Sequence, residues 1–276
     1  VRLLVVIERG FAEKALKGGA QIQALIDGSD SNTAGIIRGY LTRIVAAENK
    51  RLAGVTPSPN STTSVELISR IWFNQDLASP PFYVPAVIAN ILFIITMLLS
   101  AMAIVREKEV GTIEKIMVSP IRQFEFILGK TIPFLIIGYG NVTLISLVGW
   151  LVFRVPVRGS LLVLVGMTGL FLMSSLGTGL LISTVSRTQQ QATMTAFFIM
   201  FIAMLLSGFA FPVRSMPMLI QWLAALNPVR WYMEALRGLY MKGVGLAVLW
   251  QAAVALMLIG VTVLSIASFR FKKSVN

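Results

Sequence analysis

Five long runs without a charged residue constrain the fold of this chain most strongly. They cover residues 84–105, 131–153, 159–186, 188–213 and 243–269. About 20 apolar residues allow a helix to cross the hydrocarbon core of a bilayer, so we predict a transmembrane helix in each run. Run 188–213 begins with polar glutamines at 189–191 and ends near Pro212, but its centre is apolar and we count it as a span.

The predicted class is therefore an α-helical polytopic membrane protein. A hydrophobic fraction of 56% and a charged fraction of 13% agree with this class and lie outside the range of soluble domains. The net charge of +12 comes from basic residues spread through loops and helix flanks, without interleaved aromatic residues. We therefore expect no nucleic acid among its partners.

Basic residues at the ends of the runs predict the orientation in the membrane. One side collects nine, which are Arg106, Lys108, Lys115, Arg122, Lys130, Arg187, Arg270, Lys272 and Lys273. The other side collects six, which are Arg154, Arg158, Arg214, Arg230, Arg237 and Lys242. Lys and Arg in short loops favour the cytoplasm, so residues 106–130 and the C-terminus are predicted inside and residues 1–80 outside.

Residues 1–80 are predicted to form a small α/β domain outside the membrane. They carry 16 of the 36 charged residues and no apolar run long enough to span a bilayer. The expected elements are strands at 2–7, 20–27 and 63–73 and a helix over 31–50, capped by Ser31 or Asn32. The side chains of Asp27, Asp30 and Asn32 fit a turn better than a cation site, because the EF-hand spacing is absent.

The start of the sequence is abrupt, with Val1 leading directly into an apparent strand and no signal peptide. A domain outside the membrane needs a segment that carries it across. We therefore expect a further span upstream of Val1. Residues 81–276 are expected to form the transmembrane domain.

The absence of His and Cys excludes several kinds of chemistry. It leaves no His general base, no thiol nucleophile and no zinc site of the usual type. "GKT" at 129–131 ends like a phosphate-binding loop, but Phe124 stands where that motif needs glycine. We expect no cofactor or metal on this chain and no enzymatic activity of its own, so any ATP hydrolysis must come from a partner.

The densest charge lies between two apolar runs, with eight charged residues in 106–126. Burying them at bilayer depth would cost on the order of 20 kcal/mol, so the segment must leave the hydrocarbon. Apolar residues at helical spacing from Val110 to Met117, followed by Pro120, predict a surface helix over 106–120. It could lie against lipid headgroups or contact a protein, and its acidic residues favour the protein.

Several segments together resemble a known family. They are "REKEVGTIEKIMVSPIRQFEFILGK" at 106–130, "IDGSDSNTA" at 26–34, "WFNQDLASPPFYVPAVIA" at 72–89, "SGFAFPVRSMP" at 207–217 and "NPVRWYMEALRG" at 227–238. They are similar to the permease subunits of ABC type-2 exporters, in particular to the bacterial drug-efflux type with a large periplasmic insert. The resemblance covers nearly the whole chain, with Gln75 in place of the family's usual proline.

The resemblance implies six spans in full, of which this chain holds the last five. It implies a bacterial inner-membrane location, a second permease copy or paralogue, two cytosolic ABC ATPase subunits that bind ATP and Mg, and in some systems a periplasmic adaptor. It also implies that residues 106–120 act as a coupling helix. The coupling residues would be Arg106, Glu107, Glu109, Gly111, Thr112, Glu114 and Pro120, and Gly129 and Lys130 would mark the entry of the next span.

Residues 212–238 are expected, from the same resemblance, to form two re-entrant half-helices of an outer gate. The gate residues would be Pro212, Asn227, Pro228, Glu234 and Arg237. A plain amphipathic loop helix is the alternative. Re-entrant backbone must avoid lipid, so Trp222, Asn227 and Glu234 should be shielded. Glu234 is expected to pair with Arg230 or Arg237 at helical spacing rather than to couple protons.

No group of residues identifies the cargo. The Met and Phe side chains of the spans would suit hydrophobic or amphiphilic compounds, although helix packing or lipid contact explains the same residues: Met167, Phe171, Met173, Phe197, Met200, Phe201 and Met204. The runs contain no Asp, Glu, Lys or Arg, which argues against an ATP-independent secondary transporter. A non-transporting scaffold or receptor subunit stays open.

Overall fold

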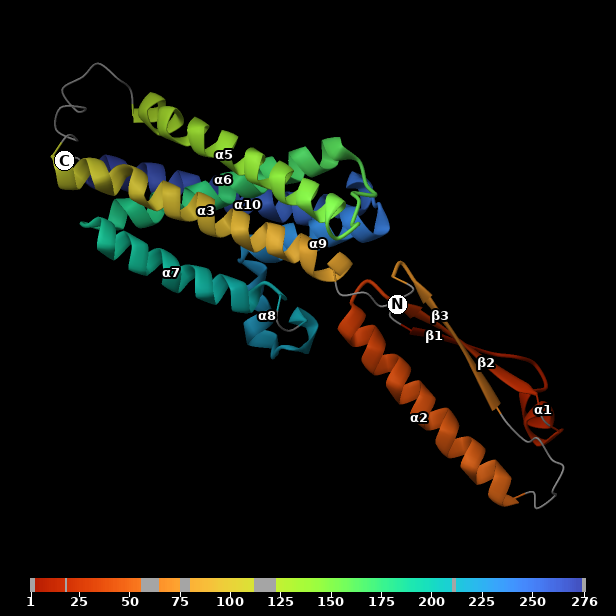
Figure 1. Cartoon of the computed structure of the whole chain (residues 1–276). Coiled ribbons are helices and arrows are strands. Elements are labelled where there is room, and N and C mark those ends of the chain that lie inside the picture. The colour runs from red at the N-terminus through yellow and green to blue at the C-terminus, as the bar shows by residue number, and fades with distance from the viewer. Residues whose placement is uncertain are drawn as a thin grey trace. The chain divides into compact units, whose positions relative to one another are not determined.

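The computed structural model describes residues 3–17, 19–55, 65–74, 80–111, 123–209 and 212–274. The chain divides into two compact units, Val1–Phe82 and Tyr83–Asn276. Figure 1 shows the elements of both units.

The first unit contains a three-stranded sheet in the order β1-β2-β3. Strand β1 (Leu3–Ile7) pairs antiparallel with β2 (Ala20–Asp27), and β2 pairs parallel with β3 (Val65–Trp72). The three strands predicted from the sequence are confirmed. The short helix α1 (Phe11–Lys17) between β1 and β2 was not predicted.

Helix α2 (Ser31–Val55) begins at the polar turn after β2 and packs on the sheet. The turn reading is confirmed, because Asp27 Oδ1 accepts a hydrogen bond from the Ser29 N–H at 3.0 Å. Asp30 caps the helix by accepting from the N–H of Thr33 at 3.0 Å and from its hydroxyl at 2.6 Å. The expected cap at Ser31 or Asn32 is therefore wrong by one or two positions. Asp30 is the residue whose carboxylate reaches the first free N–H groups.

In the described part of the second unit, five helices are long and apolar enough to cross a membrane. They are α3 (Pro80–Val110), α5 (Gln123–Leu151), α6 (Leu161–Val185), α7 (Gln189–Leu206) and α10 (Leu246–Ser274). All five predicted spans are confirmed as helices, including the one that opens on glutamines. Helix α3 extends beyond its apolar run and includes the charged residues 106–109.

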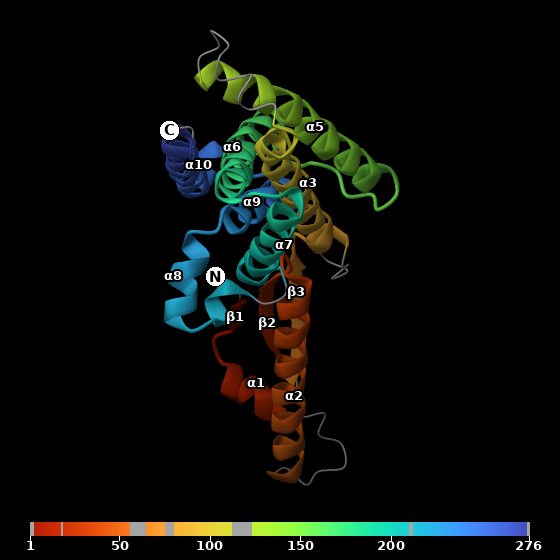
Figure 2. The same ribbon diagram turned by 90° about the vertical axis from the view of Figure 1, so that its left-hand side faces the viewer.

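Helix α6 lies at the centre of this unit, with α3 and α10 beside it (Figure 2). The approach of α3 is close because α6 has glycine where the backbones meet. A Cβ atom on Gly179 would lie 2.5 Å from the Met97 carbonyl oxygen and 2.6 Å from Ser100 Cβ. Small residues commonly allow such close packing between membrane helices.

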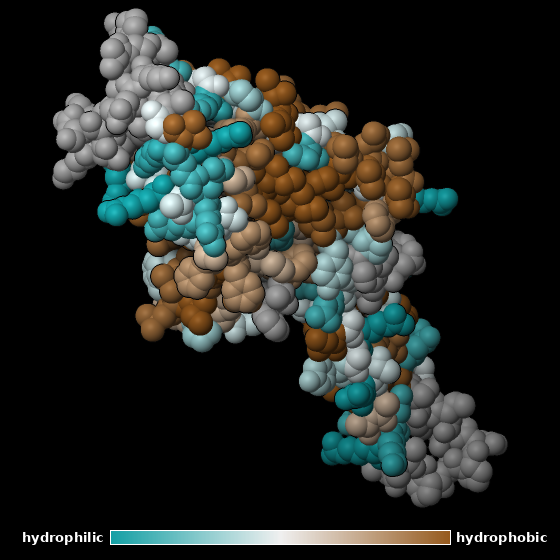
Figure 3. Space-filling view, turned by 60° about the vertical axis from the view of Figure 1, so that its left-hand side comes forward, coloured by the Kyte–Doolittle hydropathy of each residue, from teal (hydrophilic) through white to brown (hydrophobic). Residues whose placement is uncertain are grey.

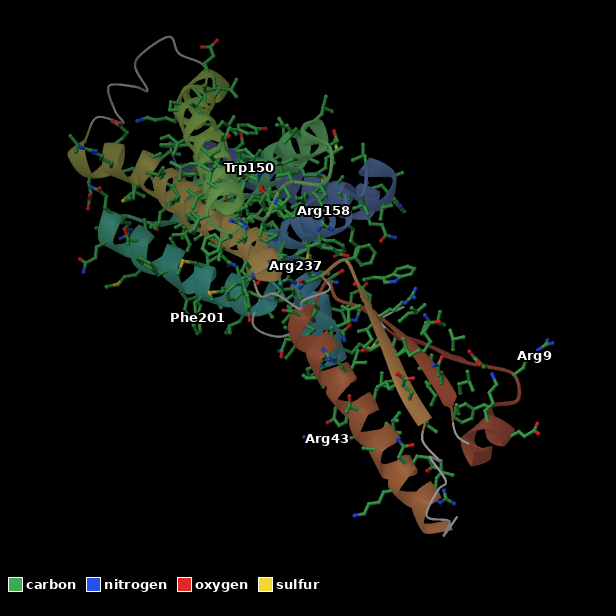
Figure 4. All side chains as sticks on the ribbon, turned by 45° about the vertical axis from the view of Figure 1, so that its right-hand side comes forward. Arg9, Arg43, Trp150, Arg158, Phe201 and Arg237 are labelled. Carbon is green, nitrogen blue, oxygen red and sulfur yellow. The ribbon has the colours of Figure 1, made fainter. Side chains whose placement is uncertain are left out.

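Helices α5 and α7 expose large apolar side chains over much of their length. The face of the helical unit in Figure 3 accordingly carries broad hydrophobic areas. Figure 4 shows Trp150 on α5 and Phe201 on α7, which are 57% and 60% exposed. Such surfaces fit contact with lipid or with another membrane subunit.

Short helical elements connect α7 to α10. They are η1 (Val213–Ser215), α8 (Met218–Ala225), α9 (Pro228–Arg237) and a π-helical turn η2 (Gly238–Lys242). Gly243 ends the turn with φ of 63°, a conformation that favours glycine. The packing there is also tight, because a Cβ on Gly243 would lie 3.2 Å from the Arg158 carbonyl oxygen.

Candidate functional site

The charged end of α3, defined here as residues 106–111, forms the first candidate site. The helix continues through Arg106 and ends at Val110. Gly111 follows with φ of 75°, which only glycine adopts without strain. The expectation that a separate surface helix begins at Arg106 is therefore wrong: residues 106–110 complete the last turns of α3. Thr112, Glu114 and Pro120 lie outside the described residues.

Glu107 joins the end of α3 to α5. Its carboxylate accepts a hydrogen bond from Lys130 Nζ at 2.8 Å, and the side chains are 23% and 34% exposed, respectively. Lys130 was expected to mark the entry of the next span, and the structure gives it a specific partner in this ion pair. Because it is partly shielded from water, the pair is better placed to hold two helices than a fully exposed one.

Lys108 joins α3 to α6 at the neighbouring position. Its Nζ donates to the carbonyl oxygens of Ser183 and Thr184, both at 3.1 Å. These carbonyls belong to the last turn of α6, where no further helical N–H groups are available and the helix dipole favours a cation. From the sequence, Lys108 was only one of the nine basic residues that predict the orientation in the membrane. Its contact with α6 was not predicted.

Glu109 joins α3 to α7. Its carboxylate accepts from the backbone N–H of Gln189 at 3.1 Å and from the Gln189 side-chain amide at 2.5 Å. Gln189 is the first residue of α7, where free N–H groups and the helix dipole favour an acid. The polar glutamines at the start of this run were the least typical part of a span. One of them, Gln189, anchors the first turn of α7.

Three consecutive side chains of α3 therefore hold three different helices. Ser183 adds a fourth connection, because its Oγ accepts from the N–H groups of Ile104 and Val105 at 3.2 and 3.0 Å. Glu107, Lys108 and Glu109 together are called the connector below. The connector therefore ties the charged end of α3 to α5, α6 and α7.

Among the described residues, Arg106, Gly111 and Gly129 are the other predicted residues at this end, and their surroundings are open. Arg106 is exposed. A Cβ on Gly111 would meet nothing within 4 Å, so its backbone angle and not a close neighbour explains the glycine. Gly129 likewise has open space around it.

The opposite end of the unit contains the second candidate site, the predicted outer gate. Two short helices were expected here, and α8 and α9 are separated at Asn227. Asn227 Oδ1 caps α9 by accepting from the Val229 N–H at 3.1 Å, while its Nδ2 donates to the Ala203 carbonyl of α7 at 2.7 Å. Asn227 is buried, and Pro228 occupies the first position of α9, where its missing N–H costs nothing. Pro212 directly precedes η1.

Two of the residues expected to be shielded, Trp222 and Glu234, are not covered by the described part of the chain. Trp222 is 67% exposed because α8 packs through Ala224 and turns its large apolar side chains outward. Glu234 is also exposed, since it lies on the polar face of α9 while Tyr232 and Met233 fill the buried face.

The expected pairing of Glu234 with an arginine does not occur among the described residues. Arg230 donates to the Gln221 carbonyl at 3.4 Å and lies 4.8 Å from the centre of the Trp231 ring. Arg237 donates to the Gly208 carbonyl at 3.5 Å. The two arginines therefore hold backbone segments around α8 and α9.

Buried hydroxyl groups fix α9 and η2 inside the unit. Tyr232 bonds the Thr168 hydroxyl at 2.9 Å and stacks on Phe171, with ring centres 4.2 Å apart. Tyr240 bonds the Ser146 hydroxyl at 2.6 Å, and burial raises the pKa of both tyrosines. Nearby, Arg158 donates to the Met241 carbonyl at 3.2 Å (Figure 4).

The Met and Phe residues considered for a cargo path fall into two groups. Met167 and Phe171 are buried in the core, so packing explains them. Phe197, Phe201 and Met204 are exposed on α7. Met173 and Met200 are half-buried. The described residues do not bring these side chains together along one path.

Comparison with known proteins agrees with this architecture. A family model described as "ABC-2 family transporter protein" matches residues 1–269. The chain is similar to the probable multidrug ABC transporter permease YbhS of Escherichia coli (strain K12), with 36% identity over 273 residues, 95% of this chain and 71% of the relative. The corresponding YbhR is 34% identical over 256 residues, 93% of this chain and 69% of the relative.

A more distant similarity reaches a eukaryotic protein. ABC transporter G family member 20 of Dictyostelium discoideum is 24% identical over 226 residues, covering 82% of this chain and 30% of the relative. The match of the family model over nearly the whole chain, together with the two bacterial relatives, decides the assignment. This chain belongs to the ABC-2 family of transporter proteins.

Proposed function

We propose that this chain is the permease of an ATP-driven exporter of hydrophobic or amphiphilic compounds, and that its connector carries the action of a partner ATPase to the spans. The connector is the observation that supports this function best. Glu107, Lys108 and Glu109 bond to the beginning of α5, the end of α6 and the beginning of α7, respectively. A partner that moves the segment after Gly111 would therefore act on three spans through one short stretch.

The assembly follows from the same proposal. The partner is a cytosolic ABC ATPase that binds ATP and Mg, and two permease copies or paralogues pair in the bacterial inner membrane. The charged end of α3 and the C-terminus face the cytoplasm, and residues 1–80 face the periplasm. The nine basic residues on one side of the spans against six on the other support this orientation. A periplasmic adaptor extends the path in some assemblies.

The cargo class is inferred from the exposed surface of α7. Phe197, Phe201 and Met204 offer aromatic and thioether contacts that adapt to different apolar shapes. YbhR and YbhS are named as probable multidrug permeases, which supports a cargo range of several different compounds. We therefore expect hydrophobic dyes to serve as test cargo.

The test uses the permease and its copurifying ATPase in liposomes, with a hydrophobic fluorescent dye as cargo. Two quantities are measured, ATP hydrolysis and dye movement. Lys108→Met keeps the length and apolar stem of the side chain but removes the ammonium group that binds α6. We expect this variant to retain the ATPase while dye moved per ATP hydrolysed falls about tenfold, equivalent to about 1.4 kcal/mol of lost coupling.

The matched control is Arg43→Met, which removes an exposed cation from α2 in the other unit. It should leave dye movement unchanged. Equal coupling in Lys108→Met and the wild type would contradict a connector function. If cargo never stimulates hydrolysis in the wild-type complex, a scaffold or receptor subunit replaces the exporter.

A further inference from the structure

At the outer edge of β3, a side chain makes the hydrogen bonds that a neighbouring strand would otherwise make. The side-chain amide of Asn49, on α2, bonds both backbone groups of Val65. The Val65 N–H donates to Asn49 Oδ1 at 2.7 Å, and Asn49 Nδ2 donates to the Val65 carbonyl at 3.0 Å. These are the two bonds that the opposite residue of an added antiparallel strand would make.

The following residues of β3 point free backbone groups to the same side. In a parallel ladder, alternate residues turn both N–H and C=O toward one neighbour. Because Val65 faces outward, Leu67, Ser69 and Ile71 also face outward, while Trp72 accepts from the Gly28 N–H at 2.9 Å beside β2. Within the described part of the chain, no hydrogen bond reaches the outward backbone groups of Leu67, Ser69 and Ile71.

This edge borders a groove beside α2. The cavity has a volume of about 510 Å³ and is lined by Arg38, Ser69, Arg70, Ile71 and Trp72. Arg38 projects from α2, and the other four residues come from β3. Trp72 is 56% exposed. The groove thus combines an open strand edge, two guanidinium groups and an aromatic surface.

We propose that the outer edge of β3 binds an extended acidic segment of a partner protein by adding it as a fourth strand. Backbone hydrogen bonds to Leu67, Ser69 and Ile71 continue the pairing that Asn49 makes with Val65. Carboxylates of the added segment bind Arg38 and Arg70, since guanidinium groups favour such pairs. A second copy of this chain fits less well, because its β3 would bring the same arginines against each other.

The test measures binding of a fluorescein-labelled peptide to the whole chain in detergent micelles by fluorescence anisotropy. The peptide has seven residues, three central glutamates flanked on each side by two valines, so that carboxylates point to both faces of the added strand, and its counterpart carries lysine in place of glutamate. We expect saturable binding of the acidic peptide only. A version with N-methylated backbone amides keeps the charge but lacks the donors that a strand needs, so it should bind at least about tenfold more weakly.

Two substitutions at one position separate the backbone from the side chain. Ser69→Pro removes an outward N–H, a change that an edge strand tolerates, whereas Ser69→Ala retains it. The proline variant should lose about tenfold in peptide affinity, and the alanine variant should bind like the wild type. Equal binding by both variants would overturn strand addition. If circular dichroism shows that Ser69→Pro does not fold, the N-methylated peptide decides the question.

A second pair of variants tests the groove. Arg70→Glu should weaken binding of the acidic peptide about tenfold. Arg43→Glu makes the same charge change on the side of α2 that points away from the sheet (Figure 4) and should have no effect. Equal losses in both variants would show diffuse charge attraction instead of a groove. If cysteines placed at position 69 cross-link two copies without peptide, the edge belongs to a second copy and the proposal is wrong.

Discussion

Helices α6 and α7 are both apolar and long enough to span a membrane, yet they are held in opposite ways. In their most apolar windows, 50% of α6 residues are buried against 17% of α7 residues. Helix α6 carries small and hydroxyl residues where it meets its neighbours, whereas α7 exposes Phe198 and Phe201. The size of the side chains therefore decides which helix packs closely and which keeps a free surface.

The two helices also differ in where their polar contacts with other helices lie. The C-terminal half of helix α6 is bonded to α3 at several points, from Ser175 to Ser183. Helix α7 makes its described polar contacts with other helices near its ends, through Gln189 to Glu109 and through the Ala203 carbonyl to Asn227. We infer that α3 and α6 move as one body and that α7 moves against them.

The largest expected effect comes from filling the closest approach of α3 and α6. Gly179→Ala places a methyl group 2.5 Å from the Met97 carbonyl, where the backbone must move. We expect a loss of about 3 kcal/mol in stability, seen as a lower unfolding temperature in detergent. Gly166→Ala is the matched control on the same helix, because a Cβ there meets nothing within 4 Å. Equal unfolding temperatures for the two variants would show that the close contact at Gly179 does not limit the stability of the protein.

A smaller effect should follow from removing one interhelical hydroxyl. Thr96→Val leaves the buried Ser175 hydroxyl, now 2.6 Å from it, without that partner. The expected cost is about 1–2 kcal/mol. Thr193→Val is the comparison on α7, where the hydroxyl bonds only the Gln189 carbonyl of its own helix, so its cost should be clearly smaller. A larger loss at Thr193 would reverse the proposed difference between the helices.

The smallest effect on stability, and the most local one, is expected at the first turn of α7. Glu109→Ala removes the acceptor of the Gln189 N–H. Because this contact is exposed, the unfolding temperature should change by less than about 3 °C. Amide hydrogen exchange in the first turn of α7 should nevertheless become severalfold faster. Gln190→Ala, an exposed neighbour, is the control, and unchanged exchange in Glu109→Ala would show that α7 is held elsewhere.

The sequence predicts the elements of this protein well because their signals are local. Runs of apolar residues locate the five spans, and the strand at 20–27 is correct to the residue. The turn at Asp27 and Asp30 is also visible in the residue types. The cap was assigned to Ser31 or Asn32 instead of Asp30, because several consecutive residues there have suitable side chains and the sequence does not select among them.

The connector could be predicted only in part, since its partners come from distant segments. Glu107 and Glu109 attract notice as acids beside a span, but the carbonyls that bind Lys108 lie about 75 residues away and carry no sequence signal. The exposure of Trp222 could not be predicted either. A short apolar helix has the same sequence pattern whether its large side chains point inward or outward. Contacts between helices decide both cases.

The most direct test of the coupling claim is a distance measurement between α6 and α7. The chain has no cysteine, so spin labels can be placed at Val185 and Met194, which are 54% and 64% exposed. Double electron–electron resonance is recorded with the partner ATPase, with and without a non-hydrolysable ATP analogue. We predict that the nucleotide shifts the distance in the wild-type background and that Glu109→Ala largely removes the shift. An identical shift in both backgrounds, or none in the wild type, would contradict transmission through the connector.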